Sequence, residues 1–98
     1  MRIIARRTLK DFWESGHANA EGPLKAWYAE VNGAEWNSMA DIKVRYPHAS
    51  VIDSERVVFN VGGNNYRLVV KLYFPAPTVF IRFVGTHAEY DRLDVKTL

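Results

Sequence analysis

The chain has 98 residues, 48% hydrophobic and 24% charged, which is the size and composition of one globular domain. Its formal net charge is only +2, so overall charge does not indicate nucleic-acid binding, and any basic site must come from local arrangement. No cysteine is present, which excludes disulfides and thiol chemistry, and no window approaches the ~18 consecutive apolar residues of a membrane span. The first residues lack the features of a signal peptide. We therefore expect a single domain over residues 1–98, soluble and cytoplasmic.

The first half of the chain predicts one short strand and three helices. Residues 2–5 are typical of an edge strand, and Thr8 has the spacing of a helix cap before an apolar run that ends at Gly16. Pro23 suits the first turn of a second helix, which closes near Asn32 and Gly33. A third, short helix is predicted from a cap at Ser38 to Tyr46. The aromatic residues of these helices and their connections are expected in the core: Trp13, Trp27, Tyr28 and Trp36.

From Val51 onward the apolar period changes to two, which indicates β-strands. Four runs are separated by short polar, glycine-rich or proline-rich turns: 51–52, 56–61, 66–74 and 78–85. Connections of this length favour hairpins, so the strands should form an antiparallel meander. The sequence thus predicts an α+β fold, with N-terminal helices packed on one face of an antiparallel β-sheet.

Alternation along the strands predicts which face each side chain occupies. Tyr66, Leu68, Val70, Leu72 and Phe74 should face the helices, together with Val57, Phe59 and Val61 of the preceding strand and Val79, Ile81 and Phe83 of the last one. The register that aligns these apolar sets pairs Phe59 with Leu68, Asn60 with Arg67, and Lys71 with Arg82.

The opposite face then gathers cationic and polar residues on a surface that the helices are expected to leave uncovered. These residues are Arg56, Asn60, Arg67, Lys71, Arg82 and Thr86. Clustered cations repel one another unless water, a partner or an anionic ligand compensates them, so the pattern favours a surface that binds something negative. The alternative is that these charges only solvate an open sheet and suppress aggregation at its edges.

The segment after the last strand adds groups that can transfer protons. Thr86 can cap a short turn of helix, which would place His87 and Tyr90 on one side of it, near Arg82. Alternatively, His87 is an ordinary surface histidine and Tyr90 fills the core. The histidines lack metal-ligand spacing, and Gly62-Gly63 joins two strands as a hairpin turn instead of forming a phosphate loop. No metal or other cofactor is expected.

The string V-F-N-V-G-G-N-N-Y-R-L-V-V-K at 58–71, followed by I-R-F-V-G-T-H-A-E-Y-D at 81–91, resembles the HigB toxins of type II toxin–antitoxin systems. The likeness extends to R-I-I-A-R-R-T-L-K-D-F-W at 2–13 and A-D-I-K-V-R-Y-P at 40–47, so it covers nearly the whole chain. The resemblance implies a RelE-like fold and a metal-independent endoribonuclease that cuts messenger RNA, commonly in the A site of a translating ribosome. It also implies a helix-turn-helix antitoxin of the HigA type, and contact with promoter DNA only through the toxin–antitoxin complex.

RNA supplies its own nucleophile, the 2′-hydroxyl, so cations and proton-transfer groups suffice for cleavage. Arg67 and Arg82 are expected to stabilise the phosphate, and His87 or Tyr90 to transfer protons or stack on a base, as catalytic residues. Lys71 is expected to bind the phosphate or act as a base. The remaining RNA-binding candidates are Arg56, Asn60 and Thr86.

Two other functions remain open from the sequence. A ParE-like toxin would bind and inhibit DNA gyrase without cutting RNA, so His87 and Tyr90 would matter little. A non-toxic RNA-binding or protein-binding module is the third possibility, although binding without catalysis usually needs a broader basic surface than this chain offers.

Overall fold

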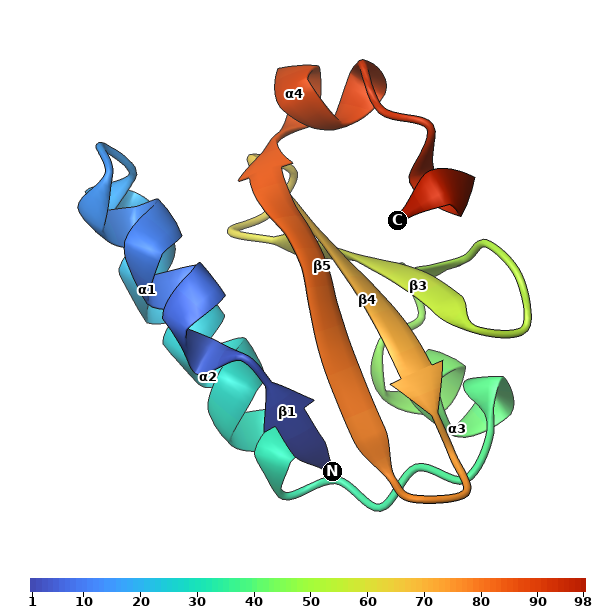
Figure 1. Ribbon diagram of the computed structural model, residues 1–98. Helices are drawn as coiled ribbons and strands as arrows, with labels where there is room; N and C mark the ends of the chain where they lie inside the picture. Colours follow the sequence, from blue (N-terminus) through green and yellow to red (C-terminus); the bar gives the residue numbers. More distant parts are fainter.

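The computed structural model describes residues 1–98 and has two layers, helices on one side and a five-stranded sheet on the other (Figure 1). The strands are β1 (Arg2–Ile4), β2 (Ser50–Val51), β3 (Arg56–Val61), β4 (Tyr66–Tyr73) and β5 (Thr78–Thr86). The α-helices are α1 (Arg6–Glu14), α2 (Glu21–Asn32), α3 (Met39–Arg45) and α4 (His87–Asp91), with 3₁₀ turns η1 (Ala18–Ala20) and η2 (Val95–Thr97). None of the helices is both long and apolar enough to cross a membrane. The predicted α+β fold is confirmed.

The helix ends follow the sequence signals only in part. The predicted cap of α3 is correct, since the Ser38 hydroxyl accepts a hydrogen bond from the Asp41 amide at 3.4 Å. The predicted cap at Thr8 is wrong: α1 already begins at Arg6 and has no side-chain cap. The second helix begins at Glu21, so that Pro23 lies in its first turn as predicted, and it ends at Asn32 as expected.

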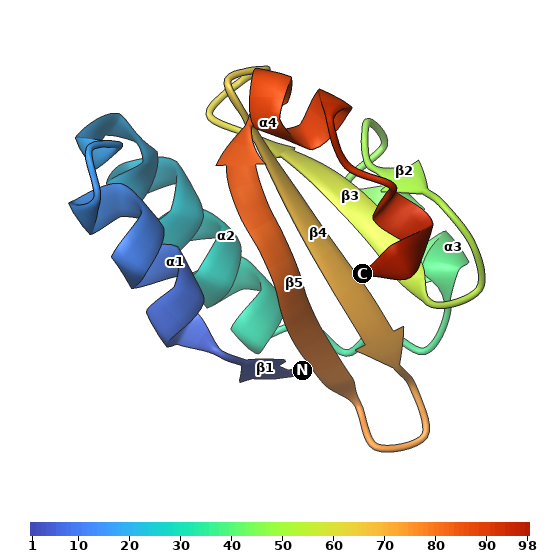
Figure 2. The same ribbon diagram turned by 45° about the horizontal axis from the view of Figure 1, so that its top comes forward.

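α1 and α2 lie side by side against one face of the sheet (Figures 1 and 2), and the core fills the space between the layers. The three tryptophans are buried in this core, and Tyr28 is partly buried. Phe59 lies at its centre, where three aromatic rings surround it: Trp27, Trp36 and Tyr46. The prediction that the helical aromatics form the core is confirmed, and their burial fixes the helices on this face.

The sheet has the order β1-β5-β4-β3-β2, so β2 to β5 form the predicted antiparallel meander and β1 adds a parallel edge strand beside β5. Two predicted pairings between β3 and β4 are correct, Phe59 with Leu68 and Asn60 with Arg67. These pairings fix Arg56, Asn60, Arg67 and Lys71 on the face away from α1 and α2, here called the outer face.

The predicted pairing of Lys71 with Arg82 is wrong because the hairpin pairs Tyr73 with Thr78, which sets the register of this end of β5 two residues away from the predicted one, and because a β-bulge follows at Arg82. Lys71 pairs with Phe80, Val70 with Ile81 and Val69 with Phe83, which leaves Arg82 without a partner in β4. The extra residue reverses the alternation in the rest of β5. Phe83, predicted to face the helices, therefore pairs with Val69 on the outer face, whereas Val84 packs against the core.

The outer face is also not open, as the sequence suggested. Val58 and Val69, which pair with each other on this face, are only 3% and 0% exposed. Figure 2 shows the chain after α4 turning back over β3 and ending in η2 with the C-terminus beside β4. Its apolar residues Leu93, Val95 and Leu98 are half-buried, while the polar residues between them are exposed. The C-terminal segment, residues 92–98, thus covers the middle of the outer face.

Candidate active site

α4 places the catalytic candidates of the C-terminal region at the end of β5. Its first turn is closed by a capping box: the Thr86 hydroxyl accepts from the Glu89 amide at 3.2 Å, and the Thr86 amide donates to the Glu89 carboxylate at 2.8 Å. The hydrogen bond from the Thr86 amide is the main cause that lowers the pKa of Glu89. The predicted cap at Thr86 is confirmed, and it directs the side chain of the next residue, His87, toward β4.

Arg67 and His87 are in direct contact. The Arg67 guanidinium lies with Nη2 at 3.1 Å from His87 Nδ1, and Nη1 donates to the main-chain oxygen of Asn64 at 3.1 Å. Since a guanidinium only donates, Nδ1 accepts, and the ring proton sits on Nε2, which faces the Asp91 carboxylate at 3.4 Å. The Arg67 guanidinium, the His87 imidazole and the Asp91 carboxylate thus lie in a row of contacts at the surface of the protein.

Arg82 and Tyr90 are near this group in sequence but do not join it. Arg82 is exposed at the bulge and makes no hydrogen bond or ion pair. Tyr90 follows His87 by one helical turn on α4 and is half-buried, with no hydrogen bond from its hydroxyl. Both side chains remain free to contact a ligand.

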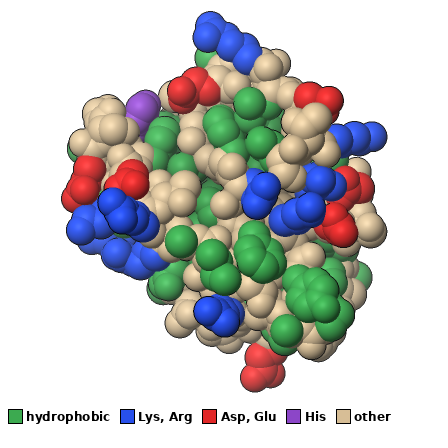
Figure 3. All heavy atoms as spheres, in the orientation of Figure 1, with side chains coloured by type: hydrophobic (Ala, Val, Ile, Leu, Met, Phe, Trp, Pro, Cys, Tyr) green, Lys and Arg blue, Asp and Glu red, His purple; other side chains and the backbone are tan.

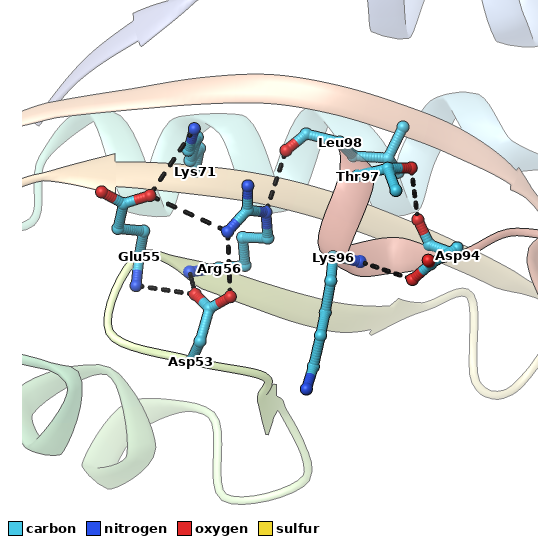
Figure 4. Close-up of polar contacts among 8 residues, drawn as sticks. All are labelled: Asp53, Glu55, Arg56, Lys71, Asp94, Lys96, Thr97 and Leu98. Atoms are coloured by element: carbon cyan, nitrogen blue, oxygen red, sulfur yellow. Dashed lines mark hydrogen bonds and ion pairs between the residues drawn. The ribbon is translucent and has the colours of Figure 1, made fainter.

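A second cluster of charges lies at the other end of β3 and β4 (Figure 4). Arg56 and Lys71 are paired across the strands, and both are neutralised by acidic residues of the preceding turn. Arg56 Nη1 lies 2.9 Å from the Asp53 carboxylate, and Lys71 Nζ lies 3.5 Å from Glu55. In the same orientation as Figure 1, basic and acidic side chains accordingly lie next to one another on this surface (Figure 3).

The predicted cations therefore do not converge on one point. Arg67 and Lys71 are four residues apart on β4, about 13 Å along the strand. Arg67 contacts His87, whereas Lys71 contacts Glu55. The structure divides the predicted site into a basic group beside α4 and a charge-balanced cluster beside the C-terminal segment.

Asn60 and Thr86 occupy different surroundings from each other. Asn60 is exposed on the outer face opposite Arg67 and lines a pocket of about 580 Å³ that Asn64 also lines. Thr86 pairs with Tyr66, whose ring is in the core, so its predicted place on the outer face is wrong. The bulge at Arg82 accounts for this error, and the Thr86 hydroxyl is occupied by the helix cap.

Some residues of these clusters were missed in the sequence. Asp91 follows His87 by four residues, a spacing that brings two side chains together on a helix and could have identified the pair. Glu89 completes a capping box with Thr86, which the T-x-x-E pattern also signals. Asp53 and Glu55 lie in the turn that directly precedes Arg56. No group of three or more His, Cys, Asp or Glu side chains is arranged to hold a metal ion.

Comparisons with known proteins agree with this fold and with the sequence motifs. Residues 20–93 match the family described as HigB toxin, the RelE-like toxic component of a toxin–antitoxin system. The chain is 30% identical over 93 residues to the mRNA interferase toxin HigB of Escherichia coli K12, covering 93% of this chain and 88% of that protein. The mRNA interferase HigB of Shigella flexneri matches to the same extent, and that of E. coli O6:H1 is 25% identical over 95 residues. The chain belongs to the HigB toxin family.

Proposed function

We propose that the protein is an endoribonuclease toxin that cuts messenger RNA and thereby inhibits translation and growth. Family membership and relatives that carry the name mRNA interferase support this function. The observation that carries the proposal for the site is the contact of 3.1 Å between Arg67 Nη2 and His87 Nδ1. It joins a fixed positive charge to a proton-transfer group on an exposed part of the sheet.

These two side chains match what cleavage by the 2′-hydroxyl requires. The nucleophilic oxygen attacks the adjacent phosphorus, its proton is removed, the 5′-oxygen leaves, and that oxygen is protonated. The Arg67 guanidinium stabilises the additional negative charge on the phosphorane. His87 carries a proton on one ring nitrogen and a lone pair on the other, so it is equipped to transfer a proton in either step.

The remaining candidates support the RNA around the reacting phosphate. Arg82 is an exposed cation in the middle of β5 that has no acidic partner, so it can contact a phosphate without breaking an ion pair. Tyr90 stacks on a base or donates its hydroxyl proton. Asn60 on β3 and Lys71 on β4 contact the RNA farther from the reacting phosphate. Lys71 must first break its ion pair with Glu55 to do so.

Cleavage takes place on the translating ribosome, with the message held in the A site, and the protein acts in the cytoplasm. A toxin of this family has an antitoxin partner. We place that partner in the helix-turn-helix class, and the complex, not the free toxin, contacts promoter DNA.

The experiment that tests the function is induction of the wild-type chain and of Arg67→Ala in growing cells, with mapping of new 5′ ends in cellular messages. New ends within translated frames are expected for the wild-type chain. Loss of a preorganised phosphate contact should reduce cleavage about a hundredfold, which corresponds to about 3 kcal/mol in the transition state. Intact messages together with DNA damage would instead identify a gyrase inhibitor, a function that neither the family nor the relatives favour.

Purified Arg67→Ala must also unfold at the same urea concentration as the wild-type chain, within error. Arg67 is half-exposed and outside the core, so only a small change is expected. Loss of toxicity that occurs only together with unfolding would contradict the assignment of the site.

A further inference from the structure

Two of the three side-chain nitrogens of Arg56, Nε and Nη1, have partners within the protein. Its side chain is only 15% exposed, and Nη1 lies 2.9 Å from the Asp53 carboxylate. Asp53 is held in turn by the main-chain amides of Glu55 and Arg56, each at 2.9 Å. A guanidinium fixed in this way gains little from a phosphate, because binding RNA would first break a half-buried ion pair. The contacts of Arg56 within the protein therefore do not favour the RNA-binding role that was expected from the sequence.

The remaining contact of Arg56 reaches across the sequence to the C-terminal segment. Nε donates to the main-chain oxygen of Leu98 at 2.9 Å, between residues 42 positions apart. Figure 4 shows Arg56 between Asp53 on one side and Leu98 on the other. Arg56 thus fixes the far end of the segment that covers the outer face of the sheet.

The near end of the same segment is α4. This helix has only five residues, far fewer than a helix needs to be stable without tertiary contacts. The capping box at Thr86 holds its beginning, and beyond Arg92 the chain runs directly into the C-terminal segment, which Figure 2 shows over β3 and β4. The position of α4, and with it the direction of the His87 side chain, depends on both attachments.

We propose that Arg56 is a positioning residue for the active site, which ties the C-terminal segment to β3 and so holds His87 and Tyr90 in place. This inference rests on the proposed ribonuclease function for its catalytic consequence. Arg56 does not touch RNA, and its effect passes through Leu98, the segment and α4. The contact is a hydrogen bond from a charged donor, the stronger kind in proteins.

Four variants test the proposal. Arg56→Ala removes the anchor, and Arg56→Lys keeps the positive charge but loses the planar fork that reaches both Asp53 and Leu98. Removal of residues 95–98 takes away the other side of the contact and leaves β3 unchanged. Lys96→Ala is the matched control, because its Nζ has the same charge on the same segment but no hydrogen bond or ion pair.

The first measurement is amide hydrogen exchange in residues 87–93, which does not depend on catalysis. Exchange there should become about tenfold faster in Arg56→Ala, in Arg56→Lys and after removal of 95–98, with no further increase when Arg56→Ala and the removal are combined. Lys96→Ala should exchange like the wild-type chain. Unchanged exchange in α4 for Arg56→Lys and for the shortened chain would overturn the proposal, even where Arg56→Ala fails to fold.

The second measurement is cleavage of messenger RNA on translating ribosomes. Disordered catalytic groups should lower kcat about tenfold or more and change KM little, in both Arg56→Lys and the shortened chain. A rise in KM for Arg56→Ala that Arg56→Lys rescues would identify Arg56 as a phosphate contact and would also overturn the proposal. A wild-type chain that cuts no RNA would refute the proposed function instead, and the exchange data would still decide whether Arg56 holds α4.

Discussion

Replacement of His87 separates its possible roles, because two substitutions remove different parts of the side chain. His87→Asn retains an oxygen near the position of Nδ1, so it can still accept a hydrogen bond from Arg67, but it cannot exchange a proton. His87→Ala removes both the acceptor and the proton-transfer group. In the structure Nδ1 lies 3.1 Å from Arg67 Nη2, so the acceptor of the asparagine lies within reach of the same donor.

The expected magnitudes follow from these contacts. Loss of proton transfer should lower the cleavage rate about 10²- to 10⁴-fold in both variants. A hydrogen bond to a charged group contributes about 1.5–3 kcal/mol when protected, but the His87 side chain is 50% exposed, so its contact with Arg67 should be weaker. A residual effect of about 0.5–1 kcal/mol makes His87→Ala roughly two- to fivefold slower than His87→Asn.

The assay is single-turnover cleavage of a defined message on stalled translating ribosomes, with toxin in excess so that binding does not limit the rate. Urea unfolding of each variant serves as the control for folding, and little change is expected because His87 lies outside the core. A rate for His87→Asn within about threefold of wild type would refute a role in proton transfer. Equal rates for the two variants would refute the view that His87 also orients Arg67.

Three further predictions concern stability. Val69→Ala should lower the free energy of unfolding by about 2 kcal/mol in urea titrations, because this side chain is fully buried on the outer face of the sheet, whereas Val44→Ala, at a position 86% exposed, should change it little. Gly85→Ala should cost about 1–3 kcal/mol in thermal unfolding, since a Cβ there would overlap the Phe83 ring and lie 3.2 Å from Glu89 Oε1; a neutral effect would contradict this close packing. The lowered pKa of Glu89 means that its carboxylate stabilises the fold above the ordinary value of 4.5, and this contribution is lost as pH falls through the lowered value. The difference in unfolding free energy between the wild-type chain and Glu89→Gln should therefore shrink from about pH 6 to about pH 3, and a constant difference would count against the capping role.

Local patterns predicted most of the fold. The alternation in β3 and β4 is uninterrupted, so the ends of β3, the pairing of Asn60 with Arg67 and the core face followed from the sequence, and β4 ends only one residue before the predicted position. The bulge at Arg82 did not, because an arginine between Ile81 and Phe83 fits regular alternation equally well. Only the packing of Val84 against the core and the pairing of Phe83 with Val69 reveal it.

The site was predictable where contacts are close in sequence, as for the cap at Thr86. The sequence indicated only that His87 lies near the cationic residues of the sheet. Its direct contact with Arg67 depends on the direction that α4 takes after β5. The path of residues 92–98 could not be inferred, because a short segment with three apolar residues has no periodic pattern that indicates its partner. Arg56 consequently looked like a free cation, although its neighbours Asp53 and Glu55 were visible in the sequence.

The bulge also affects how this chain is compared with its relatives. Since Arg82 has no partner in β4, β5 consists of two ladders that are out of phase by one residue. A relative that lacks one residue at this point would form a regular ladder and keep its later strand residues on the same faces as residues 83–86 here. A relative of equal length without the bulge would instead turn every later strand residue to the opposite face, including the one from which α4 begins. An alignment of the family must therefore decide where a one-residue gap in β5 belongs before it equates any residue beyond Arg82, His87 among them, with a residue of another toxin.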